Sequence, residues 1–373
     1  MKIDLTNYRK AQTLSKQASK QTGIQLLRAI MMIMVLLSHF VGMFPVEPFL
    51  NRTPIRLLWA GNCAVIGFFF LSGFNYCRSF ENKKNVYDIT EMVISRYIRL
   101  IPVTIISVIF ADLIRTLFHA IAYDVQLPIS TWGNSFWQTS VLLRDYVSIT
   151  SANASLWTMS IEIKYVLLII VILLVDRKID ELSSSAVGLC ALMKLILLCF
   201  LFTMAYLQKL IYLPVFYLGI LSYKKYGRRK CEHSAYGRII IVIAGITLLW
   251  CGFSFEEGQV ERNLLFCMGW FLIMYVTKDA RCEFKCGHLL SVVGDYSLYI
   301  YAAHFPILLL LRLLLIRNDL SCWIVYFICY ILFSMLGARC ISGIDKKMTA
   351  ILKKNFKKLI SIVRKENHKG SVI

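Results

Sequence analysis

The sequence has few acidic residues, no paired cysteine pattern and no large polar domain at either end. Only 22 of its 373 residues are Asp or Glu, whereas 42 are Lys or Arg, so the formal net charge is +20. A positive excess of this size can indicate nucleic-acid binding. Here, however, the basic residues gather in alternate loops between apolar runs, which is typical of a membrane protein, so we expect no nucleic-acid partner.

The cysteines argue against a disulfide framework and against a metal site. All twelve are scattered through apolar segments without paired spacing, which indicates small buried side chains. Cys282, Cys286 and His288 lie close together in a short polar loop, but no fourth ligand follows at a spacing typical of zinc sites. We therefore expect no metal in this protein.

Hydrophobic residues are abundant: they make up 58% of the chain and give it a mean hydropathy of +0.62. Soluble domains are roughly 45–50% apolar. The sequence therefore predicts an all-α polytopic integral membrane protein, a bundle of about ten transmembrane helices. The predicted spans are 24–44, 59–80, 97–121, 154–175, 187–206, 209–223, 238–254, 263–277, 291–311 and 320–342.

The positions of lysine and arginine predict the orientation of the chain. These residues gather in the N-terminal segment, in the loops after the second and sixth spans and in the tail, while the alternate loops hold few, among them Arg56 and Arg262. The positive-inside rule then predicts a multi-pass protein of the inner (cytoplasmic) membrane with both termini in the cytoplasm. Because the first apolar run is long enough to span, we expect no cleavable signal peptide.

The same distribution predicts three parts of the chain. A basic cytoplasmic segment at 1–23 precedes a transmembrane domain at 24–342, and a basic cytoplasmic tail follows at 343–373. The tail is rich in lysine, so we expect it to lie on the anionic surface of the lipid bilayer as an amphipathic segment.

Two polar side chains that are energetically unfavourable in the apolar core of a membrane share one face of the first predicted span. Arg28 and His39 are eleven positions apart, which is about three helical turns and about 16 Å along the axis, so they project from nearly the same side. Charged and titratable groups in a membrane helix mark a functional interior by default. The alternative is that Arg28 reaches the headgroups on one side of the bilayer and His39 reaches the opposite interface.

The third and fourth spans add further candidates. Arg96 and Arg99 are three positions apart and form a guanidinium fork suited to phosphate or pyrophosphate, although positive-inside anchoring explains many such pairs. Glu162 must face a cavity or a cation, either beside the two polar residues of the first span or in a structural ion pair. Lys164 points to a different face of the same helix.

The ninth span holds a second intramembrane histidine. His304 follows Tyr301 by three positions and precedes Pro306 by two. The proline should disrupt the helix just after the histidine and free carbonyl groups that need new partners. His304 and Tyr301 form a candidate secondary site, and the simpler alternative is a packed, hydrogen-bonded histidine.

Together these segments resemble the acyltransferase type 3 family of integral membrane acyltransferases. The similarity rests on five motifs in order: Arg28 and His39 with ten residues between them, the aromatic stretch Phe69–Phe74, Arg96 and Arg99 with Pro102, the stretch Leu156–Glu162, and the stretch Ser297–Pro306. One departure follows Glu162, where the family often has another acidic residue and Phe-Tyr and this chain has Ile163-Lys164-Tyr165.

The resemblance implies transfer of an acyl group, usually acetyl, from cytoplasmic acyl-CoA to a hydroxyl of a cell-surface or lipid-linked carbohydrate or polysaccharide. On this hypothesis Arg96 and Arg99 bind the phosphates of acetyl-CoA, and Arg28 adds charge nearby. His39 acts as general base or carries the acyl group itself, with Glu162 orienting the imidazole. A further hydrolase-like domain, which some members carry, is not expected.

Two alternatives belong to other classes of protein. A transporter or flippase for an anionic or lipid-linked glycan would use the same intramembrane polar residues as its pathway. A membrane sensor or scaffold would carry out no chemistry, but it would leave the arginine fork and the buried histidine unexplained. The oligomeric state stays open.

Overall fold

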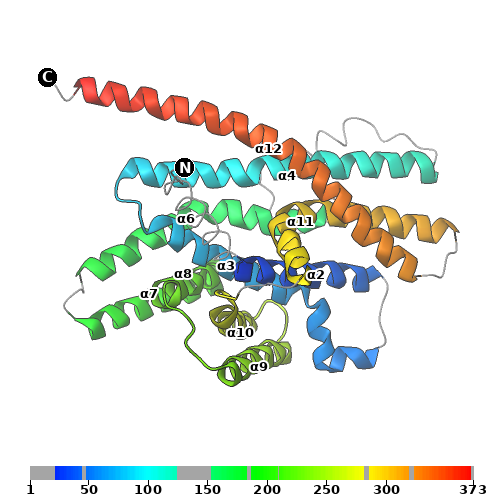
Figure 1. Ribbon diagram of the computed structural model, residues 1–373, viewed down its shortest axis with the longest axis horizontal. Coiled ribbons are helices and arrows are strands. Elements are labelled where there is room, and N and C mark those ends of the chain that lie inside the picture. Colours follow the sequence, from blue (N-terminus) through cyan, green and yellow to red (C-terminus); the bar gives the residue numbers. More distant parts are fainter. Residues whose placement is uncertain are drawn as a thin grey trace, which may run out of the picture. The chain divides into compact units, whose positions relative to one another are not determined.

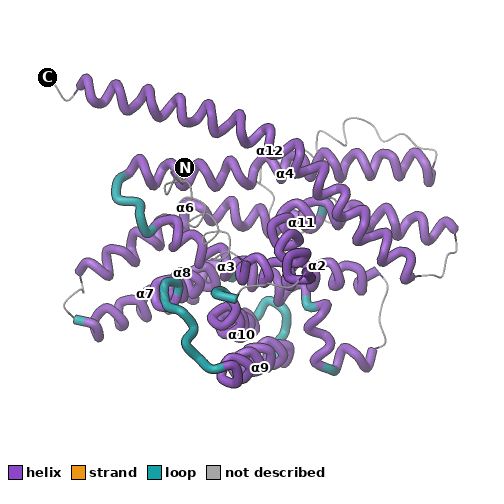
Figure 2. The backbone as a smooth tube through the Cα atoms, viewed as in Figure 1, coloured by secondary structure: helices purple, strands orange, loops and turns teal. Residues whose placement is uncertain are grey.

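The structure is a computed structural model that describes residues 22–43, 48–123, 153–182, 186–208, 210–280, 285–318 and 323–370. These residues form helices and connecting turns, without a strand among them, which confirms the all-α class (Figures 1 and 2). The α-helices are α2 Thr22–Met43, α3 Gly61–Phe80, α4 Val86–Tyr123, α6 Trp157–Leu182, α7 Val187–Gln208, α8 Leu213–Tyr226, α9 Ala235–Cys251, α10 Val260–Thr277, α11 Lys285–Asn318 and α12 Trp323–Gly370. Short 3-10 helices are η1 Pro48–Arg52, η2 Pro54–Trp59, η3 Ala154–Leu156 and η4 Gly252–Ser254.

Eight helices of the described residues are long and apolar enough to cross a membrane, so the protein is a multi-pass membrane protein. The predicted spans at 209–223 and 263–277 correspond to α8 and α10, which are not among these eight. Pro214 stands in the first turn of α8, where its missing N–H leaves no hydrogen bond unmade. The 14 residues of α8 rise by about 21 Å, less than the roughly 30 Å of a bilayer core.

Helix ends are where the predicted spans differ most from the structure. Helix α4 begins at Val86 rather than at 97, and α12 continues as one helix to Gly370, well beyond the predicted limit of 342 (Figure 1). Hydropathy marks only the apolar part of a helix. The backbone hydrogen bonds continue past it because Lys, Glu and Arg are good helix formers in water.

The chain divides into two compact units. Unit 1 comprises Met1–Asn82 and Leu168–Ser297, and unit 2 comprises Lys83–Leu167 and Leu298–Ile373. Helices α6 and α11 are each divided between the two units.

Glycines allow α3 and α8 to touch within unit 1. A Cβ atom on Gly73 would lie 2.0 Å from the carbonyl oxygen of Phe216, and a Cβ on Gly219 would lie 2.2 Å from that of Phe70. Both distances are impossible for a real side chain, so the two backbones can approach this closely only because each helix has a glycine at the crossing.

In unit 2, α4 and α11 run through Pro102 and Pro306 without a break. The disruption predicted at Pro306 is therefore a missing hydrogen bond and not an interrupted helix. Because proline has no N–H, the carbonyl four positions earlier loses its donor. That carbonyl needs another partner in an apolar environment.

Side chains from other segments supply those partners. The carbonyl oxygen of Ala302, four positions before Pro306, accepts hydrogen bonds from Ser107 Oγ at 2.6 Å and from Asn153 Nδ2 at 2.9 Å. The carbonyl oxygen of Ile98, four positions before Pro102, accepts a hydrogen bond from Thr349 Oγ1 at 3.4 Å. The expectation that Pro306 frees a carbonyl that finds a new partner is confirmed.

Candidate functional site

Arg28 and His39 lie on one stripe of α2 that is largely buried by protein. Two positions between them on that stripe, Met32 and Val35, are 0% and 1% exposed, whereas Ile33 on another face is 38% exposed. Arg28 and His39 are themselves half-buried. This stripe is covered by protein, which argues against the alternative in which both side chains run along lipid to opposite interfaces.

The two ends of α2 contact different parts of unit 1. At the arginine end, Gln25 Nε2 donates a hydrogen bond to Asp295 Oδ1 of α11 at 3.0 Å. At the histidine end, Ser38 lies against the first residue of α3, since a Cβ on Gly61 would be 2.6 Å from Ser38 Oγ. Helix α2 is therefore held by different helices near Arg28 and near His39.

The predicted guanidinium fork lies on α4 in unit 2. Arg96 is half-buried and Arg99 is exposed. Nearby, the Tyr299 hydroxyl donates a hydrogen bond to the buried carboxylate of Asp345 on α12 at 2.8 Å, and the positive charge of Arg99 acts on that hydroxyl. Asp345 was not predicted as a site residue. The feature of the sequence that could have indicated it is an acidic residue within the basic tail.

Glu162 lies on α6 in unit 2. It is half-buried and stands between the buried residues Ile161 and Ile163, while Lys164 is exposed. Residues two positions apart point to different sides of a helix, so the prediction that Lys164 lies on another face is confirmed.

His304 and Tyr301 meet the start of α6. His304 is fully buried, and its Nδ1 lies 2.8 Å from the carbonyl oxygen of Tyr301. A carbonyl only accepts hydrogen bonds, so Nδ1 is the donor in this contact. The Tyr301 hydroxyl donates a hydrogen bond to the carbonyl oxygen of Ser155 and accepts one from Thr158 Oγ1 at 2.8 Å.

Asn153 completes this cluster and was not predicted from the sequence. Its amide nitrogen donates hydrogen bonds to Ser107 Oγ and to the Ala302 carbonyl, both at 2.9 Å. Its side-chain oxygen accepts from the Ser155 N–H at 3.2 Å and from the Ser155 hydroxyl at 2.6 Å. The amide thus uses its full hydrogen-bonding capacity. An Asn just before a helix predicts a cap, but it does not predict contacts with α4 and α11.

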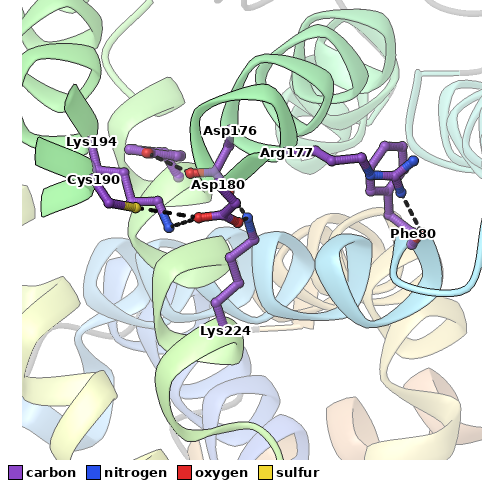
Figure 3. Close-up of polar contacts among 8 residues, drawn as sticks. Phe80, Asp176, Arg177, Asp180, Cys190, Lys194 and Lys224 are labelled. Atoms are coloured by element: carbon purple, nitrogen blue, oxygen red, sulfur yellow. Dashed lines mark hydrogen bonds and ion pairs between the residues drawn. The ribbon is translucent and has the colours of Figure 1, made fainter. Parts of the chain in front are cut away.

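A network of paired charges in unit 1 was also not predicted (Figure 3). Asp176 of α6 is 0% exposed, accepts a hydrogen bond from Tyr217 at 2.9 Å and pairs with Lys224 of α8. Asp180, one turn later, pairs with Lys224 and with Lys194 of α7 at 2.5 Å. Because each carboxylate has a cation, the network is satisfied and fits a structural role that joins three helices.

The predicted site residues are divided between the units. Arg28 and His39 belong to unit 1, while Arg96, Arg99, Glu162, Tyr301 and His304 belong to unit 2. Cys282 and the side chains of Cys286 and His288 lie outside the described part of the chain. Among the described residues, no group of three His, Cys, Asp or Glu side chains could hold a metal ion.

A comparison with protein families identifies the class of this protein. The model of the acyltransferase type 3 family, described as an acyltransferase domain, matches residues 21–342. The match covers most of the chain, so the protein belongs to this family and is a membrane acyltransferase. Comparisons with curated proteins and with solved structures found no match.

Proposed function

We propose that this protein is an O-acetyltransferase that moves an acetyl group from cytoplasmic acetyl-CoA to a hydroxyl of a cell-surface or lipid-linked carbohydrate. The observation that carries the proposal is the inward stripe of α2. This stripe places a guanidinium and an imidazole at two ends of a membrane helix, with the fully buried residues Met32 and Val35 between them. Family membership supports acyl transfer as the chemistry.

The distribution of basic residues supports an orientation for the reaction. With both termini in the cytoplasm of the inner membrane, Arg28 lies at the cytoplasmic end of α2 and His39 at the outer end. Arg96 and Arg99 begin the apolar part of α4 on the cytoplasmic side. In this proposal each of these arginines is a candidate ligand for a phosphate of acetyl-CoA, and His39 acts at the thioester.

The proposed chemistry is a transfer between a thioester and an alcohol. His39 removes the proton of the acceptor hydroxyl, and the oxygen attacks the thioester carbonyl. The carbon–sulfur bond then breaks, and the leaving CoA thiolate takes the proton from the imidazolium. In a variant of this mechanism, His39 attacks first and holds the acetyl group before the alcohol displaces it.

The test uses the purified full-length protein, labelled acetyl-CoA and a lipid-linked oligosaccharide. We expect wild type to acetylate the oligosaccharide and His39→Ala to lower the rate by roughly 10²–10⁴-fold, because that is the usual contribution of a general base. His233→Ala, which removes an exposed histidine, is the matched control and should keep wild-type activity.

Two results would contradict the proposal. Wild-type transfer by a folded His39→Ala protein would remove the catalytic role of this residue. Movement of the oligosaccharide across a vesicle membrane without acetyl transfer would favour the flippase instead.

A further inference from the structure

Two arginines share one phenylalanine ring in unit 1, outside the residues used above. The Arg56 guanidinium, on η2, lies 4.3 Å from the ring centre of Phe253 on η4. The Arg262 guanidinium, in the first turn of α10, lies 5.4 Å from the same ring and 5.4 Å from the ring of Phe266. The segment η2 and the distant, adjacent segments η4 and α10 thus bring two positive charges to one aromatic surface.

This cluster has more positive than negative charge. Arg262 is only 8% exposed, and within the described part of the chain neither Arg56 nor Arg262 forms a hydrogen bond or an ion pair. Glu257 acts on Arg56 only from a distance, while its carboxylate accepts a hydrogen bond from Asn62. A buried arginine without an anion is costly.

The two guanidiniums also affect each other. Burial and then the positive charge of Arg262 lower the pKa of Arg56, and Glu257 raises it. Cation–π contacts with Phe253 account for some attraction to each arginine. These contacts do not remove the repulsion between the two positive charges. An anion near both guanidiniums would attract each of them and offset that repulsion.

The cluster lies at the same end of unit 1 as His39. Helix α2 packs against η2, the segment that holds Arg56. Ser38, the neighbour of His39, lies against Gly61 at the start of α3, and the next residue, Asn62, donates to Glu257. In the orientation proposed above this is the outer side, where Lys and Arg are scarce. Membrane topology therefore gives no reason for two arginines to converge there.

We propose that Arg56 and Arg262, with the ring of Phe253, bind a carboxylate or phosphate group of the carbohydrate acceptor, so that the enzyme prefers an anionic glycan. Guanidinium groups suit both oxyanions. The assignment rests on the proposed function, because it names the acceptor class for the hydroxyl beside His39.

The test measures sugar binding without acetyl-CoA, so that it does not depend on transfer. Full-length protein in nanodiscs of neutral phosphatidylcholine is titrated with glucuronate, glucose 6-phosphate and glucose, followed by saturation-transfer NMR. We expect at least one of the two anionic sugars to bind ten or more times tighter than glucose. Arg56→Gln and Arg262→Gln should each remove roughly tenfold of that preference, the usual effect of losing a charged partner.

Three further variants make the result specific. Arg52→Gln removes an exposed arginine of the neighbouring segment η1 and should change nothing. Arg262→Lys keeps the charge and should keep most of the preference for the anion. Glu257→Gln removes a carboxylate that acts on Arg56 and should raise the affinity for the anionic sugar several-fold, an effect that misfolding cannot imitate.

The proposal is overturned if both anionic sugars bind no better than glucose, or if Arg56→Gln and Glu257→Gln leave the affinities unchanged. It is also overturned if phosphatidylglycerol raises the melting temperature of wild type but not of Arg262→Gln, while neither anionic sugar raises it. The anion is then a lipid headgroup. Acetyl transfer is measured in the same preparation. If wild type transfers acetyl and His39→Ala does not, the proposed function stands even when anion binding fails.

Discussion

Each buried polar side chain needs a partner for its hydrogen-bonding or charged groups. Asn153 shows one answer, since its amide makes hydrogen bonds with Ser107, Ser155 and the Ala302 carbonyl. The guanidinium of Arg262 shows another, since it contacts aromatic rings but has no anion among the described residues. A satisfied group fits a structural role, whereas a buried charge without an opposite charge is a candidate for ligand binding.

The role proposed for Arg96 predicts a specific kinetic change. Arg96→Ala should raise the Michaelis constant for acetyl-CoA about tenfold or more, because a guanidinium–phosphate contact is lost. The turnover number should change little if the contact is equally strong in the bound and transition states. Arg78→Ala, at an exposed position near the end of α3, is the control. An unchanged Michaelis constant would refute phosphate binding by Arg96.

Glu81, just after α3, predicts a pH dependence of stability. Burial by itself would raise the pKa of Glu81, but hydrogen bonds from Arg228 and Tyr223 and the charge of Arg228 bring it below its usual range. A depressed pKa means that Glu81 stabilises the fold at neutral pH and that this stabilisation is lost as the pH falls to about 4 and below.

The melting temperature of wild type should therefore fall over that pH range by more than that of Glu81→Gln. Glu256→Gln, which changes an exposed carboxylate in the turn before α10, should follow wild type. Parallel curves for wild type and Glu81→Gln would show that the contacts with Arg228 and Tyr223 contribute nothing.

At the scale of the helices, α4 and α11 keep their course because other segments replace the hydrogen bonds that prolines remove. The Thr349 hydroxyl donates a hydrogen bond to the Ile98 carbonyl near Pro102. The side chains of Ser107 and Asn153 donate to the Ala302 carbonyl near Pro306. Both prolines lie in stretches that resemble motifs of the family. Each one therefore ties its helix to a neighbour by a carbonyl that its own helix cannot satisfy.

The same arrangement predicts an energetic coupling between Asn153 and Pro306. Asn153→Ala should lower the free energy of unfolding by about 1–3 kcal/mol, because buried hydrogen-bonding groups lose their partner. In a Pro306→Ala background the loss should be about 1 kcal/mol smaller, since the N–H of Ala can serve the Ala302 carbonyl.

Reversible unfolding in mixed detergent micelles measures this cycle. Thr104→Ala is the control, because the Thr104 hydroxyl donates to Leu100 within its own helix, and its effect should add to that of Pro306→Ala. If the effects of Asn153→Ala and Pro306→Ala also simply add, the proposed replacement of the missing N–H is wrong.

At the scale of the whole molecule, the orientation that we propose would account for the net charge of +20. We predict that an epitope added after Ile373 is protected in intact cells. An epitope inserted after Gly258, in the turn before α10, should be reached by a reagent that does not cross the membrane. Gly258 suits the insertion because it has a positive φ of 88° and nothing packs where its side chain would be.

Accessibility to that reagent before and after permeabilisation measures both positions. The reverse pattern would invert the protein and place Arg28, not His39, on the acceptor side. The proposed direction of transfer would then be wrong, although the acyltransferase class would stand.

The sequence predicted the class, most helices and the positions of the costly residues. Hydropathy and helical period are local properties, so they locate α2 and show that Arg28 and His39 share a face. The motifs, read in order, identified the family. Helix ends were less predictable, as for α4 and α12, because a helix continues beyond its apolar part wherever its backbone bonds remain satisfied.

The sequence by itself thus determined that this is a helical membrane acyltransferase and that polar groups occupy its spans. Only the tertiary structure decided which groups meet. Ser107 and Ala302 are 195 positions apart, and Asp176 and Lys224 are 48 apart. Arg56 and Arg262 share a ring through three separate segments. The partners of a polar side chain depend on which helices become neighbours, and that choice depends on packing over the whole chain.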